Sequence, residues 1–158
     1  MSYLYSAIEV FEMAQEIERN GARFYRKASE NIQDAGTREF ILDLASMEDE
    51  HLRTFASMKS ALSGRETESP TFDPNNEMAL YLAALADTRV FSGRDIDTST
   101  LEGIFKAALQ AEKDSIAFYA GMKDLVPEYL GRGQLDAIIK EEMRHVRLLS
   151  ERLAKLKP

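Results

Sequence analysis

The sequence predicts an all-α fold, an antiparallel bundle of four helices arranged as two helix hairpins. The first observation behind this prediction is that apolar residues recur at helical spacing, with few β-branched runs and no convincing strand alternation. The second is the pattern of connections, because two of them are short and the middle one is long, which is typical of a bundle with one crossover. The predicted helices cover residues 4–31, 36–63, 100–124 and 132–156, with hairpins at 4–63 and 100–156 and the crossover at 64–99.

The three connections support these boundaries. The first hairpin turns at the short segment NIQDA and the second near VPEYLGRG, so the helices of each pair are expected to be antiparallel. The crossover contains the turn-forming stretches GRETESPTFDPNNE and SGRDIDTST, with a shorter apolar helix expected between them near residues 77–91. Three roles are open for this helix: it covers its own part of the core, it forms a lid over the bundle, or it contacts a second subunit. Ser99 and Glu102 have the spacing of a capping box, so we expect Ser99 to cap the third long helix.

Composition sets the broad class of the protein. Residues 1–158 are expected to form a single domain, because a chain of this size with 44% hydrophobic residues buries a substantial core without a metal or a disulfide. The absence of cysteine excludes disulfides, zinc-thiolate sites, iron-sulfur clusters and a thiol nucleophile. The net charge of −7, without a basic stripe, argues against nucleic acid as a partner. The chain has neither a long apolar stretch nor a signal-like start, so we expect a cytoplasmic protein that contacts no membrane.

The strongest functional signal is an internal repeat built around the only two histidines of the chain. Each histidine follows a glutamate by three residues, a second glutamate stands thirty residues before the first, and a tyrosine follows that second glutamate by seven residues. The chain therefore carries one functional unit twice. The two copies are Glu18, Tyr25, Glu48 and His51, and Glu112, Tyr119, Glu142 and His145.

The repeated residues occupy core positions of the predicted helices. In the first helix Phe11, Glu18 and Tyr25 are spaced by seven, which places all three on one face, and the third helix repeats this order. In the second and fourth helices, each glutamate and histidine of the repeat likewise continues a row of apolar residues. Glu16 competes with Glu18 in the first helix, but only Glu18 keeps the seven-residue spacing to tyrosine. Each repeated glutamate and histidine thus replaces an apolar core residue.

Four buried carboxylates require a compensating charge. Burying each of them costs several kcal/mol unless it is protonated, paired or coordinated, and two histidines cannot neutralise all four. Glutamate and histidine three residues apart project from one helix face, so two helices of this kind and one glutamate from each of the other two supply six ligands for two metal ions. Mixed carboxylate and imidazole ligation favours iron, with manganese or a mixed pair as the alternative.

These motifs resemble the rubrerythrin branch of the ferritin-like superfamily over nearly the whole chain. The resemblance rests on the phrases IERNGARFY and AEKDSIAFY together with MEDEH and EEMRH. It implies a ferritin-like bundle with two iron ions, bridged by Glu48 and Glu142, and places Tyr25 and Tyr119 beside the ligands. It also implies a homodimer, since related proteins are commonly dimers or larger. The implied ligands are Glu18, Glu48, His51, Glu112, Glu142 and His145.

Two departures from the family bear on function. Full-length rubrerythrins carry a rubredoxin-like module with four cysteines, and this chain has none, so its electrons are expected from another protein. Rubrerythrin peroxidases have a further glutamate one turn after the ligand of the third helix, where this chain has Ser115. The resemblance therefore implies a di-iron oxidoreductase that reduces peroxide or dioxygen, in oxidative-stress defence or iron handling. A ferroxidase acting on Fe(II) is the alternative within metal chemistry, and a metal-free helical interaction module is the alternative of another class.

Simpler interpretations of the same residues remain at this stage. The two histidines could lie on helix surfaces, each paired with the glutamate one turn back. Tyr25 and Tyr119 could be ordinary core residues whose hydroxyls bond to whichever acceptor is near. The residues that flank the motifs are rotated by about 100° from the shared face, so we expect them in solvent. These flanking residues are Asp49, Glu50 and Glu141.

Overall fold

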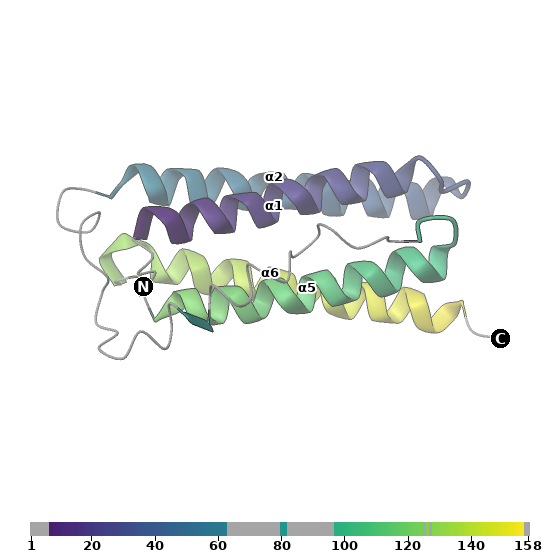
Figure 1. The fold of residues 1–158 in the computed structure, drawn as a ribbon. Helices are drawn as coiled ribbons and strands as arrows, with labels where there is room; N and C mark the ends of the chain where they lie inside the picture. The colour runs from purple at the N-terminus through teal and green to yellow at the C-terminus, as the bar shows by residue number, and fades with distance from the viewer. Residues whose placement is uncertain (1–6, 63–79, 82–96, 125, 127, 157–158) are drawn as a thin grey trace.

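The structure, a computed structural model, consists of long helices throughout the part it describes, residues 7–62, 80–81, 97–124, 126 and 128–156. No strand occurs in these residues, which confirms the all-α prediction. Figure 1 shows the long helices running along a common direction. They are α1 (Ala7–Ser29), α2 (Ala35–Ser60), α5 (Leu101–Lys123) and α6 (Arg132–Lys155), and a short 3₁₀ helix η1 (Glu128–Leu130) precedes α6.

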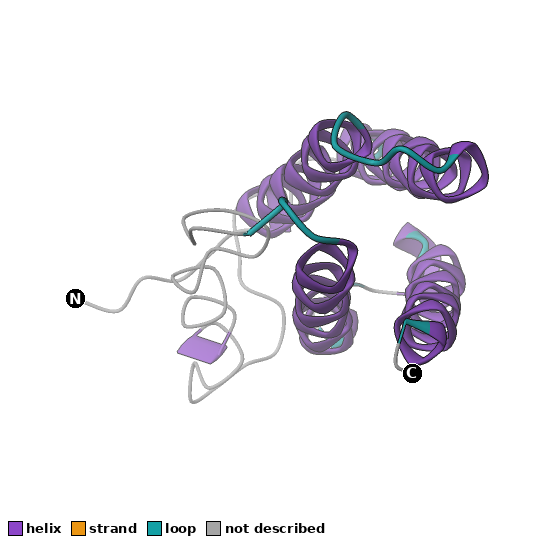
Figure 2. Ribbon diagram, turned by 90° about the vertical axis from the view of Figure 1, so that its right-hand side faces the viewer, coloured by secondary structure: helices purple, strands orange, loops and turns teal. Residues whose placement is uncertain are grey.

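The four helices form two hairpins, α1 with α2 and α5 with α6, as Figures 1 and 2 show. Contacts between the hairpins fix their relative direction. The hydroxyl of Tyr25 on α1 donates to Glu112 on α5, and that of Tyr119 on α5 donates to Glu18 on α1, so α1 and α5 are antiparallel. Helices α2 and α5 therefore point the same way, and the chain between them connects opposite ends of the bundle. This is the single-crossover bundle that the sequence predicted.

Side chains at the helix starts explain where two of the helices begin. Asp34 caps α2, since its carboxylate accepts a hydrogen bond from the backbone N–H of Thr37 at 2.8 Å. Thr100 caps α5, where its hydroxyl accepts from the N–H of Gly103 at 3.0 Å. The prediction that Ser99 caps this helix was wrong by one residue, because the Ser99 hydroxyl donates to the carboxylate of Asp97 instead.

The start of α6 depends on backbone conformation rather than on a side-chain cap. Gly131 precedes the helix with φ of 104°, in the left-handed region that favours glycine. A Cβ atom at this position would lie 2.9 Å from Oε1 of Gln134 and 3.2 Å from Cε of Met58. Glycine therefore lets the chain turn from η1 into α6 against the end of α2.

Two apolar layers fill the bundle on either side of a polar centre. One layer, near the start of α1 and the end of α5, contains Phe11, Phe55 and Tyr119 among its largest members. The other, near the end of α1 and the start of α5, contains Tyr25, Ile41 and Phe105 among its members. These residues are fully or almost fully buried. A polar group placed between the layers is thus shielded from water along the bundle axis.

The crossover lies mostly outside the described residues. Of the helix expected near residues 77–91, only Leu80 and Tyr81 are described, and both are helical. The hydroxyl of Tyr81 donates to the backbone carbonyl of Ala117 at 3.1 Å, which places this part of the crossover against α5. None of the helices in the described part of the chain is long and apolar enough to cross a membrane.

Candidate metal centre

Six polar side chains meet between the two apolar layers, and they are the six of the sequence repeat. Helices α1 and α5 each contribute one glutamate, whereas α2 and α6 each contribute a glutamate and a histidine one turn apart. Each is at most 2% exposed, although charged residues are seldom fully buried without a partner. The six residues are Glu18, Glu48, His51, Glu112, Glu142 and His145.

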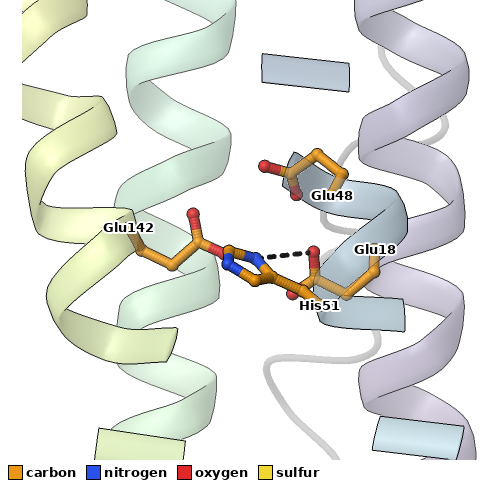
Figure 3. A group of neighbouring side chains, drawn as sticks. All are labelled: Glu18, Glu48, His51 and Glu142. Carbon is orange, nitrogen blue, oxygen red and sulfur yellow. Dashed lines mark ion pairs between the residues drawn. The ribbon is translucent and has the colours of Figure 1, made fainter. Parts of the chain in front are cut away.

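The six side chains divide into two overlapping groups of four, each small enough to surround one metal ion. In each group every residue offers a ligand atom, and the four atoms lie within 4.8 Å of one another. Glu48 and Glu142 belong to both groups. Figure 3 shows the first group, in which His51 from α2 lies between Glu18 and Glu142. The groups are Glu18, Glu48, His51 and Glu142, and Glu48, Glu112, Glu142 and His145.

The carboxylate of Glu142 lies between the two imidazole rings. Its Oε1 is 3.0 Å from Nδ1 of His51, and its Oε2 is hydrogen-bonded to Nδ1 of His145, also at 3.0 Å. The ring centroids of the two histidines are 6.0 Å apart. One glutamate of α6 thus contacts both halves of the site, which is the geometry that a bridging carboxylate needs.

Three further distances of 3.4 Å join a histidine Nδ1 atom to a glutamate oxygen of the cluster. Nδ1 of His51 is 3.4 Å from Oε2 of Glu18. Nδ1 of His145 is 3.4 Å from Oε1 of Glu48 and 3.4 Å from Oε1 of Glu112. In both rings, therefore, Nδ1 is the nitrogen that faces the four glutamates of the cluster.

The two repeated tyrosines reach the centre from opposite apolar layers. Tyr25 on α1 donates its hydroxyl to Oε1 of Glu112, and Tyr119 on α5 donates to Oε1 of Glu18. Burial raises the pKa of both hydroxyls well above 10, and the charge of the glutamate partner raises it further, so both remain protonated donors. Each tyrosine fixes one oxygen of a glutamate in the other hairpin and leaves the second oxygen directed elsewhere.

The donor atoms left without partners show that these residues fit a metal pair. Among the described residues, six buried side-chain N or O atoms have no hydrogen-bond partner, and each of the six site residues contributes one. A buried polar atom without a partner costs about 1–3 kcal/mol. Coordination of two divalent cations would satisfy the carboxylate oxygens and offset the burial of four acidic groups. The six atoms are Oε2 of Glu18 and Glu112, Oε1 of Glu48 and Glu142, Nδ1 of His51 and Nε2 of His145.

The glutamates of the metal-free site differ in their protonation. Burial raises the pKa of Glu48 and of Glu112 well above 4.5, and the charge of Glu142 raises both further. Burial acts in the same direction on Glu142, but its close contacts with Glu112 and with both histidines outweigh burial and hold its pKa far below 4.5. In the metal-free site the negative charge is therefore favoured on Glu142, and protonation is favoured on Glu48 and Glu112.

The histidines respond to that anion. Burial lowers the pKa of each ring, but close contacts with neighbouring glutamates outweigh burial and raise it. The partners are Glu142 with Glu18 for His51, and Glu112 with Glu142 for His145. The pKa of His51 rises to about 11 and that of His145 to about 9. The metal-free site thus holds protons on groups that must be bare to bind a metal ion.

One residue that the sequence argument placed in solvent belongs to the site. Glu141 has a half-exposed side chain, yet its Oε2 lies 2.7 Å from Nε2 of His51 across the gap between α6 and α2. Glu141 and Glu50 also line a surface pocket of about 210 Å³ that borders His51. No lysine or arginine is among the residues that line this pocket. Glu141 is thus exposed, as the sequence predicted, but it also contacts a residue of the facing helix, which the periodicity of its own helix does not reveal.

Other candidates lie outside the cluster. Glu16 is 54% exposed and pairs with Arg19, so Glu18 is the residue of α1 that enters the core. Asp49 pairs with Arg26 on the outside of the first hairpin. Ser115 is buried one turn after Glu112, and its hydroxyl donates to the backbone carbonyl of Ala111 at 2.9 Å.

Comparison with known proteins supports the same fold. No family model and no curated protein matches the chain. The chain is similar to a crystal structure from Thermotoga maritima that is described as a ferritin-like diiron-carboxylate protein, with 24% identity and a TM-score of 0.73. The likeness covers 99% of this chain and 100% of that one. It shows a ferritin-like four-helix fold, and the buried glutamates and histidines are compatible with a binuclear metal site in that fold.

Proposed function

We propose that this chain is a rubrerythrin-like oxidoreductase that holds two iron ions and reduces peroxide or dioxygen with electrons from an external donor protein. The observation that carries the proposal is the pair of overlapping groups that share Glu48 and Glu142, because it provides a terminal glutamate and a histidine for each ion and two carboxylates between the ions. We place the protein in the cytoplasm, in oxidative-stress defence or iron handling, and expect a homodimer.

The donor set favours iron over other metals. Four carboxylates and two imidazoles are ligands that suit iron or manganese, whereas structural zinc sites lean on cysteine and calcium sites use oxygen alone. Two ferrous ions held together would supply the two electrons that reduce one peroxide to two waters. The protein contributes ligands of fixed direction and a dry surrounding, since apolar layers lie on both sides of the site.

Tyr25 and Tyr119 are proposed to position the terminal ligands. Each hydroxyl holds Oε1 of a terminal glutamate, so the Oε2 atom of that glutamate is free of hydrogen bonds and available to an ion. Their raised pKa keeps the donated protons on the tyrosines. Partners of this kind orient metal ligands and tune their affinity.

The access route suits a small substrate. The pocket beside His51 has a volume of about 210 Å³, which accommodates dioxygen, peroxide or a hydrated ion rather than a large organic molecule. Residues 1–158 contain no cysteine and hence no rubredoxin-type iron site, and the proposal therefore takes the electrons from another protein. The hydroxyl of Ser115 occupies the position where peroxidases of this family carry a further glutamate, which leaves dioxygen and peroxide both as candidate oxidants.

A ferroxidase is the second candidate, in which Fe(II) itself is the substrate. It is favoured by the acidic pocket, because Glu50 and Glu141 line it without a lysine or arginine and would attract a cation from solvent. In this reaction dioxygen or peroxide would take the electrons of the ferrous substrate, and the ferric product would leave the site. Continued turnover would then need fresh iron rather than a reductant.

Turnover measurements on the iron-loaded protein test the proposal. The metal-free protein is loaded anaerobically with Fe(II), freed of excess iron, and supplied with peroxide or dioxygen and an artificial electron donor. Consumption of many equivalents of oxidant per chain supports the oxidoreductase, and a burst that resumes only when Fe(II) is added supports the ferroxidase. Glu48→Gln should abolish either activity, whereas Glu39→Gln, an exposed change on the same helix, should not. A chain that binds no iron would instead be a metal-free helical module.

A further inference from the structure

The two halves of the centre differ at one position of the repeat. Glu141 immediately precedes the shared glutamate of α6, and the equivalent residue of α2, immediately before Glu48, is Met47. Glu141 contacts Nε2 of His51, whereas Nε2 of His145 is buried and has no hydrogen-bond partner among the described residues. The two copies of the repeat thus carry the same candidate ligands, but among the described residues only His51 has a hydrogen-bond partner on Nε2.

The contact with Glu141 fixes the chemistry of the His51 ring. A carboxylate only accepts hydrogen bonds, so Nε2 of His51 carries the hydrogen and donates it. In the neutral ring the lone pair is then on Nδ1, the atom that faces Glu18 and Glu142. A carboxylate on the far nitrogen holds an imidazole in one orientation and makes it a more basic ligand. None of the described residues gives His145 this support.

The halves also differ in their access to solvent. His51 lines the 210 Å³ pocket together with Glu50 and Glu141, while His145 is fully buried and lines none of the described pockets. The half of the centre built around His51 is therefore the one that an incoming ion meets first. It is also the half whose histidine is held through Nε2, so that its Nδ1 can face an ion.

We infer that Glu141 is a positioning residue that makes the two metal positions unequal, so that the ion bound by Glu18, Glu48, His51 and Glu142 is held more tightly than the ion beside His145. The inference rests on the proposed binding of two ions. It adds to that proposal an order of occupation, with the solvent-facing position filled first. Activity of the loaded protein is not needed to test it.

Anaerobic titration with Co(II), followed by its visible absorbance, measures the two affinities. The wild type should bind two ions in distinct steps. Glu141→Met copies the residue of the other half and should weaken the tighter step by about tenfold, the lower end for loss of such a partner, because Glu141 is half exposed. Glu141→Gln keeps an acceptor and should recover part of that loss. Glu50→Met removes the other acidic side chain of the pocket, which has no hydrogen bond to either histidine, and should change the affinity of either binding step by about twofold or less.

NMR spectra of the histidine rings distinguish the loss of the hydrogen bond to His51 from the mere loss of a negative charge at residue 141. With only two histidines in the chain, ¹⁵N-histidine labelling resolves both rings in the Zn(II)-loaded protein. The ring N–H of His51 should be shifted further downfield than that of His145 in the wild type, and Glu141→Met should remove this difference.

Several results would overturn the inference. Two equal steps in the wild type, no weakening in Glu141→Met, or equal weakening in Glu50→Met would each contradict the role of Glu141 while leaving a two-ion site intact. Absence of Co(II), Fe(II) and Zn(II) binding in the wild type would overturn the proposed function and the inference with it.

Discussion

Glu48 and Glu142 are equivalent in the sequence repeat, yet their replacement should have different effects on the metal-free protein. Glutamine keeps the shape of each side chain and removes its ability to ionise. Burial raises the pKa of Glu48 and so favours its neutral form, which the amide of Glu48→Gln imitates. Glu142 is the anion between two imidazoles, so Glu142→Gln removes the charge that both protonated rings depend on.

The distances give the size of the difference. Each Nδ1 lies 3.0 Å from an oxygen of Glu142, and at an effective dielectric constant of about 20 one such pair of charges interacts by about 5–6 kcal/mol before desolvation is counted. Removing one partner of a buried ion pair typically costs about 3–5 kcal/mol. We therefore expect Glu142→Gln to lower the free energy of unfolding of the metal-free protein by about 3–5 kcal/mol, and Glu48→Gln to change it by about 1 kcal/mol or less.

Urea denaturation of the metal-free proteins at pH 7, followed by circular dichroism, measures this difference. Glu39→Gln serves as the control, because Glu39 is exposed on the same helix as Glu48. Equal losses in the Glu48 and Glu142 variants would refute the reasoning, and so would a Glu142 variant as stable as the wild type. In the presence of Fe(II), by contrast, both variants should lose the two-ion site.

Three further predictions concern the same centre. The folded metal-free protein holds protons on His51 up to pH about 11 and on His145 up to about 9, against 6.5 for an unperturbed histidine, so the stabilisation is complete below pH 6.5 and is lost as the pH rises. The free energy of unfolding from urea titrations should fall between pH 6.5 and 8.5, by up to about 1.4 kcal/mol per pH unit for each ring, and a constant or rising value would contradict this. Binding of Fe(II) should release protons, since metal ligands must be deprotonated, and an indicator dye in weakly buffered solution would expose a binding reaction that releases none. Tyr25→Phe and Tyr119→Phe should each weaken iron binding about tenfold or more by freeing the glutamate that the hydroxyl holds, and unchanged affinity in both would show that the tyrosines serve packing alone.

The fold was predictable because its signals are local. The seven-residue rows of Phe11, Glu18 and Tyr25 fix which face of α1 is buried, and the two short turns fix the hairpins. The ends were less predictable. Ser99 and Thr100 are both good capping residues, and Asp97 engages the serine and leaves the threonine to cap α5. The crossover helix expected near residues 77–91 stays a prediction beyond Leu80 and Tyr81.

The candidate site was predictable as a set of residues but not as an arrangement of charge. The repeat identifies the six buried side chains because each takes a core position that an apolar residue would otherwise fill. The contact between Glu141 and His51 crosses from one hairpin to the other, which no helical periodicity encodes. The different protonation of Glu48 and Glu142 likewise depends on distances that exist only after the hairpins pack.

Diffraction from crystals soaked anaerobically in Fe(II) and measured at the iron absorption edge would test the central claim most directly. The account predicts two anomalous peaks within the bundle, one beside His51 and one beside His145, with Glu48 and Glu142 between them. No peak among the six side chains, or a single ion that contacts neither Glu48 nor Glu142, would contradict it.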